Sequence, residues 1–70
     1  MRTTGTVKFF DLAKQYGLIN TDQGRSAVVH QHDLTGVPNH VLMKKDRVTF
    51  ELARDKNGLR AIDVELARAT

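Results

Sequence analysis

Apolar and polar residues alternate along much of this chain with a period of about two residues, which is the period of β-strands rather than helices. The clearest case runs from Arg47 to Arg54, where Val48, Phe50 and Leu52 fall on one face and the residues between them on the other. Four more stretches are rich in β-branched and aromatic residues and are bounded by turn formers: Thr3 to Phe10, Tyr16 to Thr21, Ser26 to Gln31 and Leu59 to Leu66. The pattern predicts five short strands.

The first of these strands contains a conflict. Strict alternation places Val7 and Phe9 on one face and Lys8 and Phe10 on the other, so the two phenylalanines cannot both be exposed. An extra residue in a strand re-aims the side chains that follow it. A twist or bulge near Gly5 would therefore resolve the conflict.

Turn-forming residues separate the predicted strands. Asp11 to Gln15 connects the first two, and the Asp11 side chain can accept a hydrogen bond from the backbone two residues on. Asp22 to Arg25 is a second turn, with Gly24 available for positive φ. Asp55 to Gly58 ends in the Asn-Gly pair that favours a hairpin. The first three strands then form a meander, and the last two form a hairpin.

The least regular segment runs from His32 to Lys45 and includes the only proline, Pro38. It is too long for a tight turn and too broken for a regular helix, although Asn39 could cap one short turn. We interpret it as a long loop that Leu34 and Leu42 pin to the body of the domain.

The last strand has one alternative. As a strand it buries Ile62, Val64 and Leu66 on one face. Asp63 to Ala69 also contains good helix formers, but a helix this short is marginal without tertiary support. We therefore predict the strand.

Five short strands in 70 residues predict an all-β fold, a small five-stranded antiparallel barrel that forms one domain over residues 1–70. Closing the sheet removes exposed edges and lets the apolar faces share one interior. The residues expected there are Val7, Ile19, Val29, Val48, Phe50, Leu52 and Val64.

Composition narrows the function. The chain has no cysteine, which excludes disulfides, thiolate metal sites and cysteine nucleophiles. It lacks both an apolar run of about 20 residues and a signal peptide, so we expect a soluble, cytoplasmic protein without a membrane segment. Eleven basic against eight acidic residues give a formal charge of +3, which favours polyanionic partners but is also common in soluble proteins of this size.

Patterns for catalysis and metal binding are weak. His30 and His32 would share one face of a strand, and His40 follows later, but no cysteine or clear third ligand accompanies them. No Ser-His-Asp arrangement, carboxylate pair or phosphate-cradling glycine loop is evident. The following aspartates sit where turns favour them: Asp11, Asp22, Asp33 and Asp55. We expect no enzyme, no metal and no cofactor.

Five segments follow one another at a spacing that can be traced nearly end to end: Gly5 to Asp11, Lys14 to Ile19, Val28 to His30, Val48 to Glu51 and Asn57 to Ala61. Together they resemble the bacterial cold-shock protein family. Members of that family are five-stranded oligonucleotide-binding-fold (OB-fold) barrels that bind single-stranded RNA and DNA. The resemblance implies the same barrel, the cold-shock domain.

The resemblance also implies a nucleic-acid-binding face. Positions that match the family are Lys8, Phe10, Lys14, Tyr16, Gly17 and His30, while Phe9 stands where the family usually has tryptophan. Other positions depart from it: Gln15 replaces a glycine, Leu18, Val28 and Gln31 replace phenylalanines, and Asn39 lies where another aromatic is frequent. Arg25 and Arg60 fall near the rim of the face. The expected nucleic-acid-binding residues are Lys8, Phe9, Phe10, Lys14, Tyr16, Leu18, Val28, His30 and Arg60.

These departures affect the expected affinity. Stacking a base on an aromatic side chain contributes about 1–3 kcal/mol, and about four stacking positions here are aliphatic or amide. Binding should therefore be weaker, shorter in footprint or more dependent on charge. Arginine can stack on a base as well as contact phosphate, so we expect a steep salt dependence.

Two hypotheses follow. In the first, the chain binds single-stranded RNA or DNA by base stacking and phosphate neutralisation, as an RNA chaperone or a regulator of transcription or translation. In the alternative, the eroded face of the same OB-fold barrel serves protein interaction or self-association. We expect a monomer, although a long loop between the two halves of a barrel is compatible with a swapped dimer.

Overall fold

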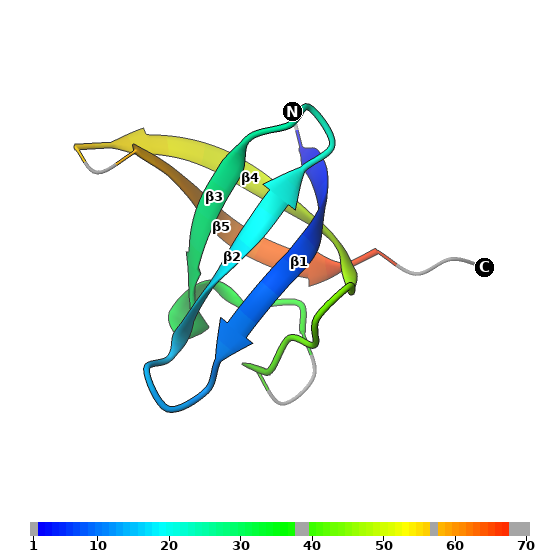
Figure 1. Cartoon of the computed structure of the whole chain (residues 1–70), viewed down its shortest axis with the longest axis vertical. Coiled ribbons are helices and arrows are strands. Elements are labelled where there is room, and N and C mark those ends of the chain that lie inside the picture. Colours follow the sequence, from blue (N-terminus) through cyan, green and yellow to red (C-terminus); the bar gives the residue numbers. More distant parts are fainter. Residues whose placement is uncertain (1, 38–39, 57, 68–70) are drawn as a thin grey trace.

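The computed structural model describes residues 2–37, 40–56 and 58–67. Its elements are β1 (Thr3–Asp11), β2 (Tyr16–Thr21), β3 (Ser26–His30), the single 3₁₀ turn η1 (Gln31–Asp33), β4 (Arg47–Asp55) and β5 (Gly58–Leu66) (Figure 1). The five predicted strands are present, with ends that differ by one residue at most. The helix considered as an alternative from Asp63 onward does not form as far as Leu66, because β5 continues to that residue.

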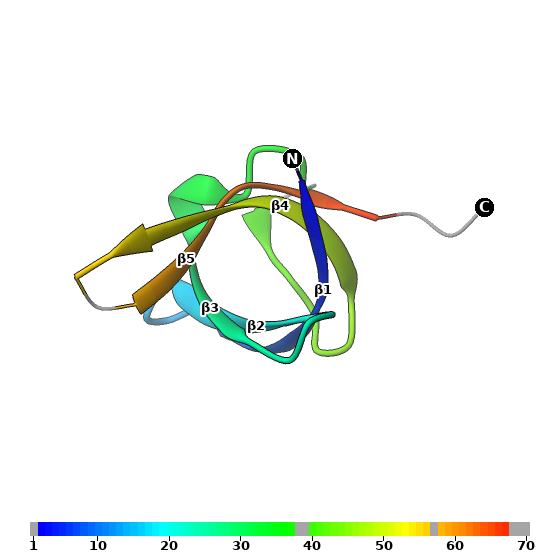
Figure 2. The ribbon, with the colours of Figure 1, turned by 90° about the horizontal axis from the view of Figure 1, so that it is seen from above.

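The strands close into a barrel in the order β1-β2-β3-β5-β4. Figure 2 shows the closed ring of strands from above. The predicted five-stranded barrel is confirmed, and its junctions are antiparallel except between β3 and β5. There the strands run parallel, with Val28 opposite Arg60. The alternation of apolar residues decides which face a strand buries, but it does not decide the direction of its neighbour.

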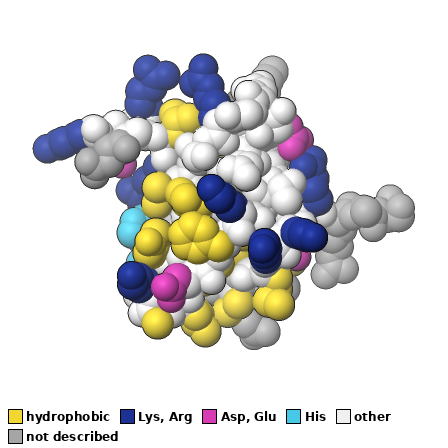
Figure 3. Space-filling model, viewed as in Figure 1, with side chains coloured by type: hydrophobic (Ala, Val, Ile, Leu, Met, Phe, Trp, Pro, Cys, Tyr) yellow, Lys and Arg dark blue, Asp and Glu magenta, His cyan; other side chains and the backbone are white. Residues whose placement is uncertain are grey.

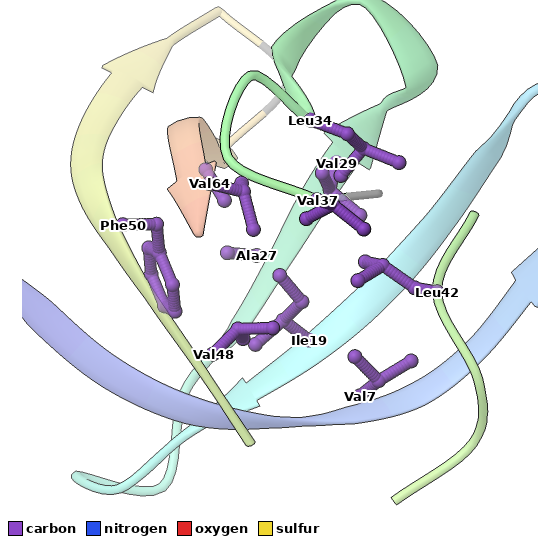
Figure 4. Close-up of a cluster of buried hydrophobic side chains, with 11 residues drawn as sticks. Val7, Ile19, Ala27, Val29, Leu34, Val37, Leu42, Val48, Phe50 and Val64 are labelled. Carbon is purple, nitrogen blue, oxygen red and sulfur yellow. The ribbon is translucent and has the colours of Figure 1, made fainter. Parts of the chain in front are cut away.

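One hydrophobic core fills the barrel. Figure 4 shows its side chains converging on the interior from all five strands and from the segment after β3. The predicted core is confirmed, because six of the seven residues are buried and Leu52 packs against them. Ala27, Val37 and Ala61 join this core, and so do Leu34 and Leu42, which pin the long loop as predicted.

A bulge in β1 lies at Lys8. Val7 pairs with Ile19 and Phe9 pairs with Leu18, so Lys8 is the extra residue between them. Val7 is therefore buried, at 1% exposure, whereas Phe9 is 36% exposed. The prediction that Val7 and Phe9 share a face is wrong. The bulge was expected near Gly5, but it lies further along the strand, at Lys8. The Val7 backbone instead bonds with Lys45 and Asp46 in the segment before β4, at 2.9 Å in each case.

A second irregularity lies in β5. The register with β4 shifts between Thr49 and Glu51, and Asp63 has a φ of 53°. Ala61 consequently enters the core and Ile62 does not, so the prediction that Ile62 lies on the buried face is wrong. The Arg2 guanidinium donates to the backbone carbonyls of Thr49 and Asp63, at 2.9 Å and 2.6 Å, and so ties the chain start to this bulge.

The predicted turns can be checked where the chain is described. The Asp11 carboxylate accepts hydrogen bonds from the backbone N–H groups of Ala13 and Lys14, at 3.0 Å and 3.2 Å. Gly24 has a φ of 85°, as its turn requires. The predictions for Pro38, Asn39 and Asn57 fall outside the described residues. Within the described part of the chain, no helix is long and apolar enough to cross a membrane.

Candidate nucleic-acid interface

Outward-facing side chains form a row across the barrel surface. Phe9 on β1 lies opposite Leu18 on β2, which lies opposite Val28 on β3, which lies opposite Arg60 on β5. Their neighbours Ile19, Val29 and Ala61 are buried, so the row itself faces out. Four of the predicted site residues are therefore brought together, although they come from four strands.

A second row lies two residues further along, at a spacing of about 7 Å. In this row Tyr16 on β2 lies opposite Asp11 on β1 and opposite His30 on β3. Asp11 is engaged in the turn described above, which leaves the Tyr16 ring and the exposed His30 as the flat groups of the row. The two rows meet where the rings of Phe9 and Tyr16 contact each other edge to face, with centroids 6.0 Å apart.

We call the surface made by Phe9, Leu18, Val28, Tyr16 and His30 the stacking face. Figure 3 shows apolar side chains gathered over β2 and β3 with lysine and arginine side chains around them and a histidine beside them. Lys8, at the bulge, and Lys14, in the β1–β2 turn, are exposed. Neither lysine forms an ion pair with any described residue. The surface thus combines flat groups with free positive charge.

Gly17 allows β1 and β2 to approach closely beneath this face. A Cβ atom there would lie 2.8 Å from Cα of Phe10 and 2.9 Å from its Cδ1, and it would also meet the Phe9 carbonyl oxygen. Any larger residue would displace the strand that carries Phe9. The close packing of β1 against β2 therefore explains why position 17 needs a glycine.

The family comparison agrees with this geometry. Residues 3–67 match the family model described as the 'Cold-shock' DNA-binding domain. The chain belongs to this family. Relatives of this cold-shock domain include the major cold shock protein CspA of Pseudomonas aeruginosa, 32% identical over 93% of this chain and 94% of the relative. The cold shock-like protein CspG of Shewanella violacea is 36% identical over 89% and 90%, and the cold shock-like protein CspA of Stigmatella aurantiaca is 37% identical over 87% and 91%.

Two of the departures from the cold-shock pattern have structural consequences. Gln15, where the family has glycine, adopts a φ of 62°, a left-handed conformation that favours glycine. Gln31 replaces an aromatic residue, and its side-chain amide donates to the carbonyl of His40 at 3.2 Å. Gln31 therefore ties the long loop to η1 and adds no flat surface to the stacking face.

Phe10 and Arg25 lie apart from the two rows. Phe10 pairs with the buried Gly17 and packs, half-buried, against the core of this cold-shock domain. Arg25 is exposed in the turn before β3, whereas His30 is at the other end of that strand. Phe10, one of the nine predicted site residues, thus also contributes to the packing of the barrel.

Arg60 has a partner that the sequence did not reveal. Its Nε and Nη2 atoms both donate to Oδ2 of Asp33, at 3.3 Å and 3.0 Å. Asp33 is read from sequence as a turn residue, and no local pattern links it to a residue 27 positions away. Together with Val28, His30, Leu59 and Asp55, Arg60 lines a pocket of about 170 Å³ at the β3–β5 side of the stacking face.

Among the described residues, no three histidine, cysteine or acidic side chains gather closely enough to hold an ion. His30 instead lies across from Tyr16 in the second row of the cold-shock domain.

Proposed function

We propose that this chain binds single-stranded RNA or DNA on its stacking face. One observation carries the proposal: the edge-to-face pair of the exposed Phe9 and the half-buried Tyr16 has two exposed lysines close by in the sequence, Lys8 and Lys14, and neither forms an ion pair with a described residue. Aromatic rings stack on bases whatever their sequence, and lysines release counterions from the phosphates that they contact. Membership of a DNA-binding domain family supports this binding role over an enzymatic one.

The geometry favours a single strand over a duplex. The ring planes of Phe9 and Tyr16 are inclined at 82°, so bases stacked on both rings cannot remain stacked on each other. Bases in a duplex are already stacked and paired, and their faces are closed to side chains. A strand bound in this way is held unpaired without any bond being broken. That activity is what an RNA chaperone needs, and it would also alter structures that control transcription or translation.

The proposal also limits the expected affinity for a single strand. Leu18 and Val28 occupy the middle of the first row and offer apolar contact without a ring. Gln31 is engaged with His40. Fewer rings mean fewer stacked bases, at about 1–3 kcal/mol for each. We therefore expect a short footprint and a large electrostatic share in the affinity.

Tyr16 provides the test, because the chain contains one tyrosine and no tryptophan. Titration with heptathymidylate at low salt should quench its fluorescence, since the only strong emitter lies on the stacking face. A thymine–adenine hairpin with a stem long enough to stay paired at low salt should cause much less quenching and should bind more weakly. Equal binding of both forms, or no binding by the folded protein, would contradict the proposal; the second result would favour a protein partner for this face.

A further inference from the structure

We propose that the pocket beside Arg60 takes a guanine base of the bound strand, and that Asp33 positions the Arg60 guanidinium that reads it. This inference rests on the proposed function, because the base arrives as part of a single strand. The pocket holds about 170 Å³. That is several times the roughly 30 Å³ that one water occupies in the liquid, so the pocket is large enough for a planar ring system.

The ion pair leaves one edge of the guanidinium open. Asp33 accepts from Nε and Nη2, which together form the side edge of the planar group. The end edge, formed by Nη1 and the outer hydrogen of Nη2, makes no hydrogen bond with any described residue. The Asp33 side chain is 17% exposed and that of Arg60 is 42% exposed. The acceptor is thus the more buried partner, while the arginine that it orients remains accessible.

An open arginine edge matches guanine better than adenine or thymine. Guanine presents two acceptors side by side, O6 and N7, which pair with two parallel N–H donors. Adenine places an amino donor beside N7, and that donor opposes an arginine, which has no acceptor. Thymine offers a single acceptor on the corresponding edge. The fixed fork therefore favours guanine over adenine and thymine.

Apolar side chains form part of the pocket wall, beside the carboxylate of Asp55. Val28 and Leu59 provide apolar surface for the ring, and His30 joins the pocket to the second row of the stacking face. Val28 is also part of the first row, directly opposite Arg60. A strand that stacks on Phe9 and Tyr16 can therefore continue into the pocket without leaving the face.

The test compares heptathymidylate with seven strands that carry one guanine at each position in turn, and with seven matched adenine strands. At its best position, guanine should bind about 5- to 150-fold more tightly than thymine or adenine, as a good bidentate contact provides. Arg60→Lys should remove this preference, because lysine keeps the charge but lacks the fork. Arg25→Lys, on the far turn, is the matched control and should keep the preference.

Asp33 is tested as a positioning residue by Asp33→Asn. We expect the guanine-to-thymine ratio to fall towards one while heptathymidylate affinity stays within about twofold, which a general loss of folding would not produce. If Arg60 contacts only phosphate, the parent chain will show no guanine preference and Arg60→Gln will weaken the binding of all strands equally. That result would overturn the inference.

The outcomes separate this inference from the proposed function. Tight but equal binding of guanine and thymine strands overturns the guanine pocket alone. Absence of binding to every strand overturns the proposed function and the pocket with it. Guanosine monophosphate tests whether the base comes from a free nucleotide. If an equimolar amount of guanosine monophosphate displaces the best guanine strand, the pocket binds a free nucleotide and the assignment to a base of a bound strand is overturned. If the strand is not displaced, that assignment is supported.

Discussion

The rings of Phe9 and Tyr16 meet edge to face, with centroids 6.0 Å apart and planes inclined at 82°. Phe9 reaches this position because Lys8 is an extra residue in β1, which turns the following side chain out of the barrel. Gly17 then lets the two strands lie close enough for the contact. The bulge at Lys8 and the lack of a side chain at Gly17 thus together allow the contact between the two rings.

Replacing Leu18 with an aromatic residue should strengthen binding. Leu18 lies between Phe9 and Val28 in the first row, so a ring there would extend the surface available to bases. We expect Leu18→Phe to increase heptathymidylate affinity about fivefold or more, the lower limit of one added stacking contact. Met43→Phe adds the same ring at a side chain that is 65% exposed and outside both rows. Equal affinities of the two variants, measured by fluorescence anisotropy, would contradict the role of the row.

Gln15→Gly should stabilise the fold. A non-glycine residue in the left-handed region costs about 1–2 kcal/mol, and the added freedom of glycine in the unfolded chain offsets about half of it. We expect the free energy of unfolding in urea to rise by about 0.5–1 kcal/mol. Gln23→Gly is the matched control, because Gln23 is exposed in a turn and does not have a positive φ. That change should lower the stability, and a loss in both variants would show that the conformation of Gln15 carries no strain.

Stability should depend on the Asp22–Arg47 pair in acid. Arg47 donates to both carboxylate oxygens of Asp22, at 2.7 Å and 2.8 Å, and this holds the pKa of Asp22 well below its ordinary value of 3.8. A lowered pKa in the folded state means that the ionised form favours folding. The contribution is complete above the ordinary pKa and is lost as the pH falls from there towards the pKa of the folded state.

Urea unfolding of Asp22→Asn and of the parent chain between pH 7 and pH 2 measures this contribution. The parent should be more stable at pH 7, and the difference should shrink steadily below about pH 4. Arg47→Gln should behave in the same way, because it removes the other partner. A difference that stays constant over the whole range would show that the ion pair does not control this titration.

The lysines beside the stacking face should set the salt dependence. Each phosphate neutralised on a single strand contributes about 0.7 to the slope of log affinity against log salt. Lys8→Gln and Lys14→Gln should each reduce the slope by about that amount. Lys44→Gln, an exposed lysine in the segment before β4, should leave it unchanged. A slope that is equal in all three variants would place the phosphates elsewhere.

Much of the barrel could be predicted from alternation, because a strand with one buried face must repeat every second residue. Val48, Phe50 and Leu52 show this directly. The same rule failed at Phe9 and Ile62, where hydrogen bonds to segments distant in the sequence support a bulge: backbone bonds of Val7 in β1, and the Arg2 side chain at Asp63 in β5. Such partners leave no mark on the local pattern.

The candidate site could be predicted in part. The family resemblance located the residues of both rows, but it could not show that Phe10 turns towards the core. The Arg60–Asp33 pair depends on β3 and β5 running side by side, and their parallel pairing follows from the path of the long loop. The contacts that could not be predicted from the sequence are therefore those between segments that meet only when the barrel closes.

The central claim, that bases stack on Phe9 and Tyr16, is tested most directly by their removal. Binding of fluorescein-labelled heptathymidylate should be measured for Phe9→Ala, Tyr16→Ala and the control Met43→Ala, with thermal unfolding to establish that each variant is folded. We predict that each aromatic replacement weakens binding about 5- to 150-fold and that the control changes it less than twofold. Affinities of folded Phe9→Ala and Tyr16→Ala within twofold of the parent would contradict the account.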